Sequence, residues 1–480
     1  MPNSNKIHIE TLGCRLNQIE SESIAKVFSD FGFFILMDCL SAKSQIDFDV
    51  KVSILNTCAV TQKSEQKARR LINLMLEKFP FSLIIVTGCY AQLSEKQILK
   101  INERVFVIAG QIKSRISEIP LIFCNFLQQN EWNALSFKNK LFDLVSIPQQ
   151  KKFFPENSFK LAASSFFAHS RASLKIQDGC NNNCSYCAIH IARGHSVSLD
   201  VKTATERVIE LENKGYDEVV LTTVNIAQYR GLYNDKYLNF TQLLKILLEK
   251  TDKIHFRISS LYPEIIDDDF CNVISNPRVQ PHFHLSVQSG SNKILKLMKR
   301  QYNSCDIIKA CKMLKNSKKE PFIACDIIVG FPGETDDDFC DTENLLKECD
   351  FSWVHAFVYS ERQGTEAVQL KNKVPQAISK EREKKLLQWA IDQKIKYCNK
   401  FLGKKLYAIL ESVKRPSVIL KNDANFVYHA VTENFLHCQI VSEIQLATSK
   451  KTEVEITKVL TENIKKGGDL EVFAKIIEKK

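Results

Sequence analysis

The chain has 480 residues, of which 44% are hydrophobic and 25% are charged, so it has the composition of a folded globular protein and not of a disordered or fibrous one. Single hydrophobic cores stop growing at roughly 250–300 residues, and two or three domains are therefore expected. The excess of 66 Lys and Arg over 55 Asp and Glu gives a net charge of +11, which favours an anionic partner such as nucleic acid.

The first residues and the apolar runs of the chain bear on its location. The start MPNSNKIHIETLGC lacks the basic patch and apolar stretch of a secretory leader, and no apolar run reaches the roughly 18 residues of a membrane span. We therefore expect a cytoplasmic protein with no membrane and no DNA partner. Its sixteen cysteines should stay reduced there, so closely grouped ones are interpreted as metal ligands or catalytic thiols.

Residues 1–115 alternate strand patterns with amphipathic helix patterns. Strands are expected at residues 6–12, 52–57, 82–88 and 103–110, and helices at 17–31 and 61–79. This rhythm predicts a parallel sheet flanked by helices. Cys14, Cys58 and Cys89 each follow a predicted strand, and the carboxyl ends of parallel strands share one edge. The fold would therefore bring these cysteines together, unless they are three unrelated buried thiols.

Residues 116–165 show a weaker, polar pattern that we interpret as a linker with one short element. Residues 166–400 then resume the alternation. Strands are expected at residues 174–177, 217–226, 253–260, 282–289, 322–330 and 353–360, with helical patterns between them. Six strand and helix repeats are too few for a closed eight-unit barrel and predict an open (β/α)6 one, with its chemistry at the carboxyl ends of the strands.

The last part of the chain changes character. A charged helix is expected at residues 379–400, and residues 401–480 contain short strand patterns at 405–413, 417–422, 426–435, 438–444, 453–460 and 470–477. Short strands separated by turn residues predict a small antiparallel β-barrel. Such a barrel binds single-stranded nucleic acid in many proteins, and a plain capping domain is the alternative.

The loop QDGCNNNCSYCAIH follows the first barrel strand and contains Cys180, Cys184 and Cys187. Three thiolates on so short a loop can converge only on a soft metal or an iron–sulfur cluster. A four-iron cluster would keep one iron without a protein ligand, and such an open position can bind a substrate or cofactor. Zinc is the competing interpretation, with His190 or His195 as the fourth ligand.

The C-x3-C-x2-C loop resembles the radical S-adenosylmethionine superfamily, and further motifs resemble its methylthiotransferases. These motifs are TLGCRLNQIESE, NTCAVTQKSEQKARR, VTGCYAQ, LKIQDGCNNNCSYC, RISSLYP, HLSVQSGSNKILKLMKRQY and DIIVGFPGETDDDF. Together they cover nearly the whole chain. The resemblance implies an N-terminal cluster domain, a radical barrel and a C-terminal β domain of the TRAM type.

The resemblance also implies two [4Fe-4S] clusters. Cys180, Cys184 and Cys187 would hold the cluster that binds S-adenosylmethionine and cleaves it to a radical. Cys14, Cys58 and Cys89 would hold an auxiliary cluster that handles the transferred sulfur. An electron donor such as flavodoxin or ferredoxin would be a partner.

The motif GFPGE follows the fifth barrel strand. Gly330, Pro332 and Gly333 are candidate cofactor-binding residues, because glycines would let the backbone approach the cofactor closely; the alternative is an ordinary turn. Asp326 and Glu334 could reach the cofactor or substrate, or could cap the next helix. No other catalytic residue is assigned. Related sequences usually carry proline where His190 stands and glycine where Thr223 stands.

The contexts TLGCRLNQ and NTCAVT are most similar to the methylthiotransferase branch that acts on N6-threonylcarbamoyladenosine beside the tRNA anticodon. The alternatives within this class are N6-isopentenyladenosine in tRNA and an aspartate of a small-subunit ribosomal protein. The basic helix and the β domain favour RNA, because phosphate contacts supply affinity and a loop base can be splayed into a pocket. A non-catalytic zinc or iron–sulfur RNA-binding protein is the alternative from another class.

Overall fold

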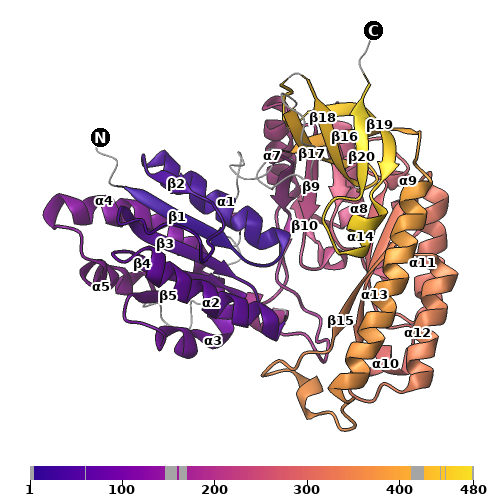
Figure 1. Ribbon diagram of the computed structural model, residues 1–480, viewed down its shortest axis with the longest axis horizontal. Coiled ribbons are helices and arrows are strands. Elements are labelled where there is room, and N and C mark those ends of the chain that lie inside the picture. Colours follow the sequence, from indigo (N-terminus) through magenta and orange to yellow (C-terminus); the bar gives the residue numbers. More distant parts are fainter. Residues whose placement is uncertain are drawn as a thin grey trace.

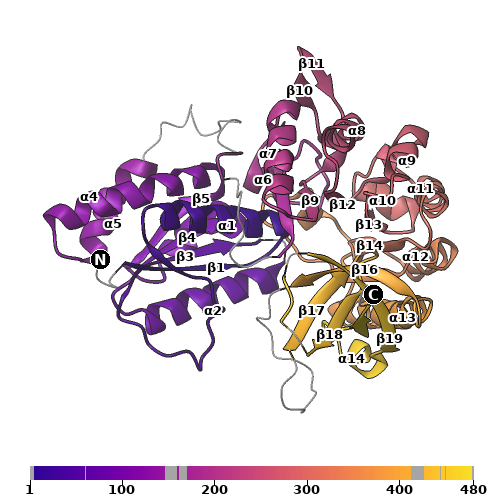
Figure 2. The same ribbon diagram turned by 90° about the horizontal axis from the view of Figure 1, so that it is seen from above.

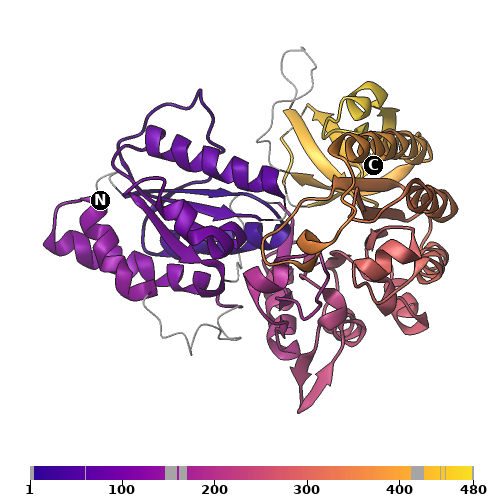
Figure 3. The same cartoon turned by 90° about the horizontal axis from the view of Figure 1, so that it is seen from below.

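The computed structural model describes residues 5–59, 61–145, 159–161, 170–411, 426–443, 445–448 and 450–477. Three units are visible in Figure 1: an N-terminal α/β unit, an open α/β barrel, and a small β-barrel packed against the second unit. Figures 2 and 3 show that the N-terminal unit flanks the other two on one side.

The N-terminal unit has a five-stranded sheet of order β2-β1-β3-β4-β5, and every pair in it is parallel. Its strands are β1 (Lys6–Thr11), β2 (Phe34–Leu36), β3 (Val50–Thr57), β4 (Leu83–Gly88) and β5 (Val105–Ala109). Its first three helices are α1 (Arg15–Asp30), α2 (Gln62–Lys78) and α3 (Cys89–Leu99). This confirms the predicted parallel sheet, and the sequence analysis missed the short β2 and α3.

Two apolar cores cover the two faces of this sheet. Successive strand residues point to opposite faces, so Ile85 packs with α1 while its neighbour Ile84 packs with α2 and α3. A strand buried on both faces needs a continuous apolar run, and β4 has one in Leu83–Gly88. This pattern makes the strands easy to locate from sequence.

The segment interpreted as a linker with one short element instead contains two helices, α4 (Ile119–Gln129) and α5 (Ala134–Val145). Both pack in the same core as α1, through Phe123, Phe126 and Phe137 among others. The aromatic stripe recurs at helical spacing, but the Asn, Gln and Lys residues between its members hid it. The 3-10 segment η1 (Gly110–Glu118) joins β5 to α4.

The second unit contains six parallel strands in two three-stranded sheets, β12-β9-β6 and β13-β14-β15. A parallel bridge between Leu261 and Leu285 links the two sheets. The strands are β6 (Ala172–Lys175), β9 (Glu218–Thr222), β12 (His255–Ile258), β13 (His282–Gln288), β14 (Phe322–Val329) and β15 (Trp353–Val358). The predicted open (β/α)6 barrel is confirmed.

Helices lie outside the barrel strands, and short accessory elements connect them (Figure 2). The helices are α6 (Ile189–Arg193), α7 (Val201–Asn213), α8 (Phe240–Lys250), α9 (Asp268–Ile274), α10 (Asn292–Leu297), α11 (Ser304–Ser317) and α12 (Asp336–Cys349). The accessory strands are β7 (Gln177–Asp178), β8 (Val197–Ser198), β10 (Gly231–Tyr233) and β11 (Lys236–Leu238). Most of the larger helices begin at a capping side chain, as Asp200 shows at α7.

The third unit is a closed barrel of order β16-β17-β18-β20-β19. Its elements are β16 (Lys405–Glu411), β17 (Phe426–Thr432), β18 (His437–Ser442), β19 (Lys451–Val459), β20 (Val472–Ile476) and the helix α14 (Thr461–Lys465). All pairs are antiparallel except β18 with β20. The predicted small β-barrel is confirmed, and the strand expected at 417–422 lies outside the described residues.

The helix α13 (Gln376–Asn399) is the charged helix that the sequence predicted, and it packs along β15 before leading into β16. Its residues Ile391, Tyr397 and Cys398 belong to the same apolar core as the β-barrel. Among the described residues, no helix combines the length and the apolar character needed to cross a membrane.

Arg257 of β12 holds the open barrel and the β-barrel together. Its guanidinium donates to both carboxylate oxygens of Glu218, at 2.8 and 2.9 Å, and to the backbone carbonyls of Thr432 and Glu433 at 3.1 and 3.2 Å. Burial acts to raise the pKa of Glu218, but Arg257 and Arg171 lower it to about 2. This is a fully desolvated, bidentate ion pair.

Arg257→Ala would leave Glu218 buried without its closest cation. We expect this substitution to lower the free energy of unfolding by about 3–5 kcal/mol, measured by urea denaturation. Lys312→Ala is the control, because it breaks an ion pair with Glu348 whose side chains are 66% and 51% exposed. That substitution should cost less than about 1 kcal/mol, and equal effects of the two substitutions would contradict the assigned role of Arg257.

Candidate active site

Cys14, Cys58 and Cys89 lie where three neighbouring strands of the N-terminal sheet end. Cys14 caps the start of α1 after β1, Cys58 directly follows β3, and Cys89 is the first residue of α3 after β4. Because β1, β3 and β4 are adjacent and parallel, the three residues share one edge of the sheet.

The glycines before Cys14 and Cys89 permit this crowding. A Cβ atom at Gly13 would lie 2.5 Å from Cβ of Cys58, and one at Gly88 would lie 2.3 Å from the carbonyl oxygen of Thr57. Both glycines also have positive φ angles, 108° and 98°, which L side chains rarely adopt. The GC pairs in the sequence are therefore required by the close approach of the strand ends.

Cys180, Cys184 and Cys187 lie on the loop between β7 and α6, after the first barrel strand. Each sulfur accepts at least one hydrogen bond. The donors are the backbone N–H of Asn182 and Nδ2 of Asn225 to Cys180 at 3.4 and 3.7 Å, Nη1 of Arg300 to Cys184 at 3.3 Å, and the backbone N–H of Ile189 to Cys187 at 3.5 Å. Cys180 has two such donors, and all four stabilise sulfur in its thiolate form.

Burial opposes the thiolate form in both triplets. It raises the pKa of the Cys187 thiol to about 12, and it also raises the pKa values of Cys180 and Cys89. Near Cys89 this effect is opposed by the positive charges of Arg193 and Lys113. Buried thiols of this kind become stable thiolates when they bind metal, because coordination removes the proton.

The donor sets of both triplets consist of thiols alone. Thiolates are the ligands that hold iron–sulfur clusters, and three of them leave one iron of a four-iron cluster without a protein ligand. The chemistry of both donor sets therefore fits such a cluster. Within the described parts of the chain, no group of three His, Cys, Asp or Glu side chains is arranged to hold a single metal ion.

The two histidines of the zinc interpretation differ in their surroundings. His195 is exposed and its Nδ1 lies 3.4 Å from Oδ1 of Asn181. The Nδ1 atom of His190, on α6, is buried without a hydrogen-bond partner.

Thr223, at the position where related sequences usually carry glycine, contacts Ser259. Its Oγ1 lies 3.2 Å from the serine Oγ.

The GFPGE loop packs against α13. A Cβ atom at Gly330 would lie 2.0 Å from Oγ of Ser379, and the carboxylate of Glu334 accepts from the N–H of Gly330 at 2.6 Å and from Arg382 at 2.5 Å. Glu334 thus braces the loop and does not cap α12, whose N-cap residue is Thr335. Contacts of Gly330, Pro332 and Gly333 with a cofactor stay a prediction.

An ion pair inside the open barrel was missed by the sequence analysis. Nε2 of His284 on β13 lies 3.2 Å from Oδ1 of Asp326 on β14, and Nδ1 lies 2.9 Å from Oγ of Ser260. The ring of His355 on β15 neighbours that of His284, and the two ring centroids lie 5.5 Å apart. The sequence did contain a signal for this pair, because His284 and Asp326 are polar residues at interior positions of otherwise apolar barrel strands.

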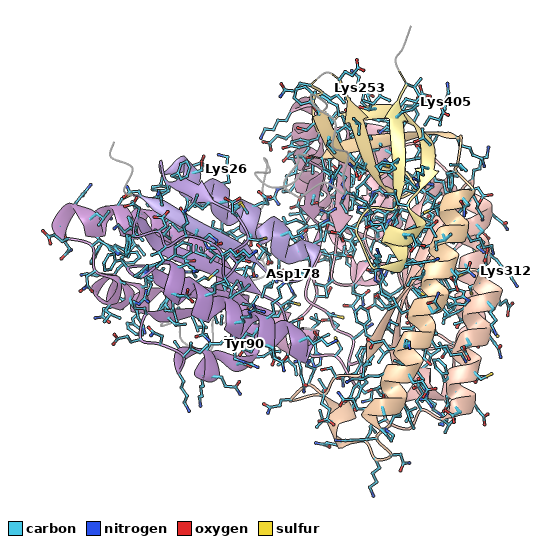
Figure 4. The ribbon with its side chains drawn as sticks, viewed as in Figure 1. Lys26, Tyr90, Asp178, Lys253, Lys312 and Lys405 are labelled. Atoms are coloured by element: carbon cyan, nitrogen blue, oxygen red, sulfur yellow. The ribbon has the colours of Figure 1, made fainter. Side chains whose placement is uncertain are left out.

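Figure 4 shows that Tyr90, next to Cys89, and Asp178, two residues before Cys180, both lie near the junction of the N-terminal unit and the barrel. Helix α6, which follows Cys187, packs on α3, which begins at Cys89. The structure therefore places the two cysteine-bearing segments next to each other, although they are about a hundred residues apart.

The comparisons with known proteins agree with this architecture. Residues 174–346 match the model of the radical SAM superfamily, and residues 6–110 match a family described as uncharacterized protein family UPF0004. The matched residues and the open barrel with its three-cysteine loop identify a radical S-adenosylmethionine enzyme.

Curated relatives narrow this class. The chain is 38% identical to the threonylcarbamoyladenosine tRNA methylthiotransferase MtaB of Treponema pallidum, with 94% of this chain and 97% of the relative covered, and 33% identical to that of Thermotoga maritima, with 89% and 92% covered. It is 29% identical to the tRNA-2-methylthio-N(6)-dimethylallyladenosine synthase of Neorickettsia sennetsu, with 86% and 84% covered. The chain belongs to the family of threonylcarbamoyladenosine tRNA methylthiotransferases. A non-catalytic RNA-binding protein is not supported.

The pair formed by His284 and Asp326 predicts a pH-dependent contribution to stability. Burial acts to lower the pKa of His284, but Asp326 outweighs it and raises the pKa above its usual 6.5. Burial acts to raise the pKa of Asp326, but His284 lowers it below 3.8. The stabilisation is therefore fully present from about pH 4 to about pH 6.5 and is lost as the pH rises through the folded pKa of His284.

Asp326→Asn should consequently lower the melting temperature of the metal-free protein more at pH 5.5 than at pH 9, measured by thermal denaturation. Asp337→Asn, at an exposed position of α12, serves as the control and should show no such difference. A larger effect of Asp326→Asn at pH 9 would refute the assigned ion pair.

Proposed function

We propose that this protein inserts a methylthio group at C2 of N6-threonylcarbamoyladenosine next to the anticodon of tRNA. The main support is the placement of two cysteine triplets, each at the carboxyl edge of parallel strands, on two units that meet at a buried junction. Five curated relatives with 32–38% identity carry the name of this activity. The contexts of Cys14 and Cys58 agree with it.

In this proposal Cys180, Cys184 and Cys187 hold a [4Fe-4S] cluster that binds S-adenosylmethionine, and Cys14, Cys58 and Cys89 hold an auxiliary [4Fe-4S] cluster. When bound, these groups supply the electron, the radical, the methyl group and the sulfur of the reaction. An electron donor such as flavodoxin or ferredoxin would reduce the first cluster. The cytoplasm is the proposed location.

The chain's own residues would orient these groups and exclude water. Arg300 donates to Cys184 and lies 4.9 Å above the rings of Tyr262 and Tyr302, which keep it rigid beside the sulfur. Gly330, Pro332 and Gly333 would present the loop backbone to S-adenosylmethionine, braced by Glu334 and Arg382. His284 and Asp326 would face the substrate inside the barrel.

The β-barrel is the proposed site of tRNA contact. Tyr407 on β16 is 42% exposed. Lys451 lies 4.0 Å above its ring. Exposed aromatic rings stack on unpaired bases, and lysines contact phosphates, so these two neighbouring side chains combine the two features of single-stranded RNA binding.

Nucleoside analysis of tRNA tests the substrate and the reaction together. In cells that lack this gene, mass spectrometry should show loss of the 2-methylthio derivative of N6-threonylcarbamoyladenosine and accumulation of its parent nucleoside. The wild-type gene should restore the derivative. Loss of the methylthio group from N6-isopentenyladenosine, or an unmodified ribosomal-protein aspartate, would instead identify one of the alternative substrates.

A single cysteine substitution separates radical formation from RNA binding. Cys184→Ala should reduce 5′-deoxyadenosine formation to background and lower the iron content from about eight to about four per chain, because one cluster is lost. Its affinity for tRNA should stay within about twofold, since phosphate contacts supply most of the binding energy.

The control is Cys305→Ala, at an exposed cysteine near the start of α11. This substitution should leave 5′-deoxyadenosine formation, iron content and tRNA affinity unchanged. A large loss of tRNA affinity in Cys184→Ala would contradict the proposed separation of the two roles. Normal radical formation in that variant would contradict the assignment of the first cluster.

A further inference from the structure

Five charged side chains meet at the junction between the N-terminal unit and the open barrel. Their side chains are 4–11% exposed, so the cluster is almost entirely removed from water. The N-terminal unit contributes Glu20 and Lys113, and the barrel contributes Lys175, Asp178 and Arg193. Figure 4 labels Asp178 at this junction.

Glu20 is the acceptor that both units share. Its carboxylate accepts from Lys113 at 2.5 Å within its own unit, and from Lys175 and Arg193 of the barrel at 3.1 and 3.2 Å. Lys175 also lies 2.9 Å from Asp178. The pairs that cross the junction oppose a shift of one unit against the other, because a shift removes part of the pairing of buried charges.

Arg193 makes the most directional contacts in the cluster. Its Nη1 donates to Glu20 at 3.2 Å and to Asp178 at 2.9 Å, and its Nη2 donates to Oδ1 of Asn17 at 2.7 Å. One planar guanidinium thus joins α1 of the N-terminal unit to the strand before Cys180. A guanidinium holds such partners in one orientation, and a lysine ammonium cannot.

Arg193 also stands between the two cysteine triplets. It is the last residue of α6, which begins two residues after Cys187, while Asn17 and Glu20 lie on α1, which begins directly after Cys14. A small pocket at the junction is lined by both Arg193 and Cys89. Burial acts to lower the pKa of Arg193, but Asp178 and Glu20 outweigh it and raise the pKa. The thiols of Cys89 and Cys14 lie close enough to contribute in the same direction.

The charges of the cluster do not cancel. Three cations and two carboxylates leave a net charge of +1 in a buried place, which is costly unless an anionic group lies beside it. Three thiolates at the adjacent edge would supply that negative charge. The cluster therefore has the sign expected beside a thiolate-ligated auxiliary site.

We propose that Arg193 is a positioning residue for methylthio transfer. It aligns the Cys180–Cys187 loop with the N-terminal unit and holds a positive charge beside Cys89 and Cys14. This inference rests on the proposed function. Its two parts are separable, because Arg193→Lys keeps the charge and loses the planar fork, while Arg193→Gln loses the charge.

The test uses the full chain with both clusters reconstituted. Electron paramagnetic resonance of the reduced protein reports the magnetic coupling between the two clusters, and redox titration reports the potential of the auxiliary cluster. Neither measurement requires tRNA. We expect both variants to change the coupling, and only Arg193→Gln to shift the auxiliary potential to more negative values, because a nearby positive charge favours the reduced form.

The ratio of methylthiolated nucleoside to 5′-deoxyadenosine is the third measurement. It should fall by on the order of tenfold to a hundredfold in both variants, because small misplacements of reacting groups cost this much. Formation of 5′-deoxyadenosine itself should change by less than about threefold. If Arg193→Gln does not retain its iron, Arg193→Lys alone still tests whether Arg193 aligns the two units.

Arg171→Lys and Arg171→Gln are the matched controls. Arg171 is also a buried arginine, with an ion pair to Glu411 at 3.1 Å, but it joins the open barrel to the β-barrel. Neither control should change the coupling or the auxiliary potential. Unchanged coupling and an unchanged product ratio in iron-replete Arg193→Lys would overturn the proposal. If no methylthiolated tRNA forms even in the wild type, the proposed function fails, while the coupling and the potential still test Arg193.

Discussion

Residues that follow the carboxyl end of a parallel strand must lie at one edge of its sheet, and this constraint organises both halves of the molecule. It gathers Cys14, Cys58 and Cys89 from three separate loops of the N-terminal sheet. It also places the Cys180–Cys187 loop at the corresponding end of the open barrel. Strand cores tolerate little change, whereas the loops beyond them can vary, so reactive residues accumulate at these edges.

Bringing two such edges together requires polar groups at a junction that excludes water. Removing these charged groups from water costs free energy, and pairing between them offsets this cost. Glu20 accepts from cations of both units. The open barrel and the β-barrel are joined by the guanidinium of Arg257, which pairs with Glu218 of its own unit and donates to backbone carbonyls of the β-barrel. The ion pair of Arg171 with Glu411 also crosses between these two units. Apolar packing alone would hold these units together but would not specify one orientation, because it has little directional preference. Charged, directional contacts specify the orientation.

The strands were predictable because burial on both faces imposes long apolar runs, as in Leu83–Gly88. Helices α4 and α5 were not, since polar residues between Phe123 and Phe137 masked an apolar stripe that only packing reveals. The pair of His284 and Asp326 escaped because its members come from different strands. The partners of Glu20 are 93, 155 and 173 residues away in sequence, and no local pattern links them.

Local spacing was thus enough to recognise the C-x3-C-x2-C motif, since Cys180, Cys184 and Cys187 lie within one short loop and are close together in any fold. The strand rhythm, with parallel topology, was enough to expect a second triplet at one sheet edge. The packing of α6 on α3, the charge beside Cys89 and the contacts of Arg193 depended on how separate units pack. Their contacts join residues far apart in the chain, and such contacts exist only after the units have folded and docked.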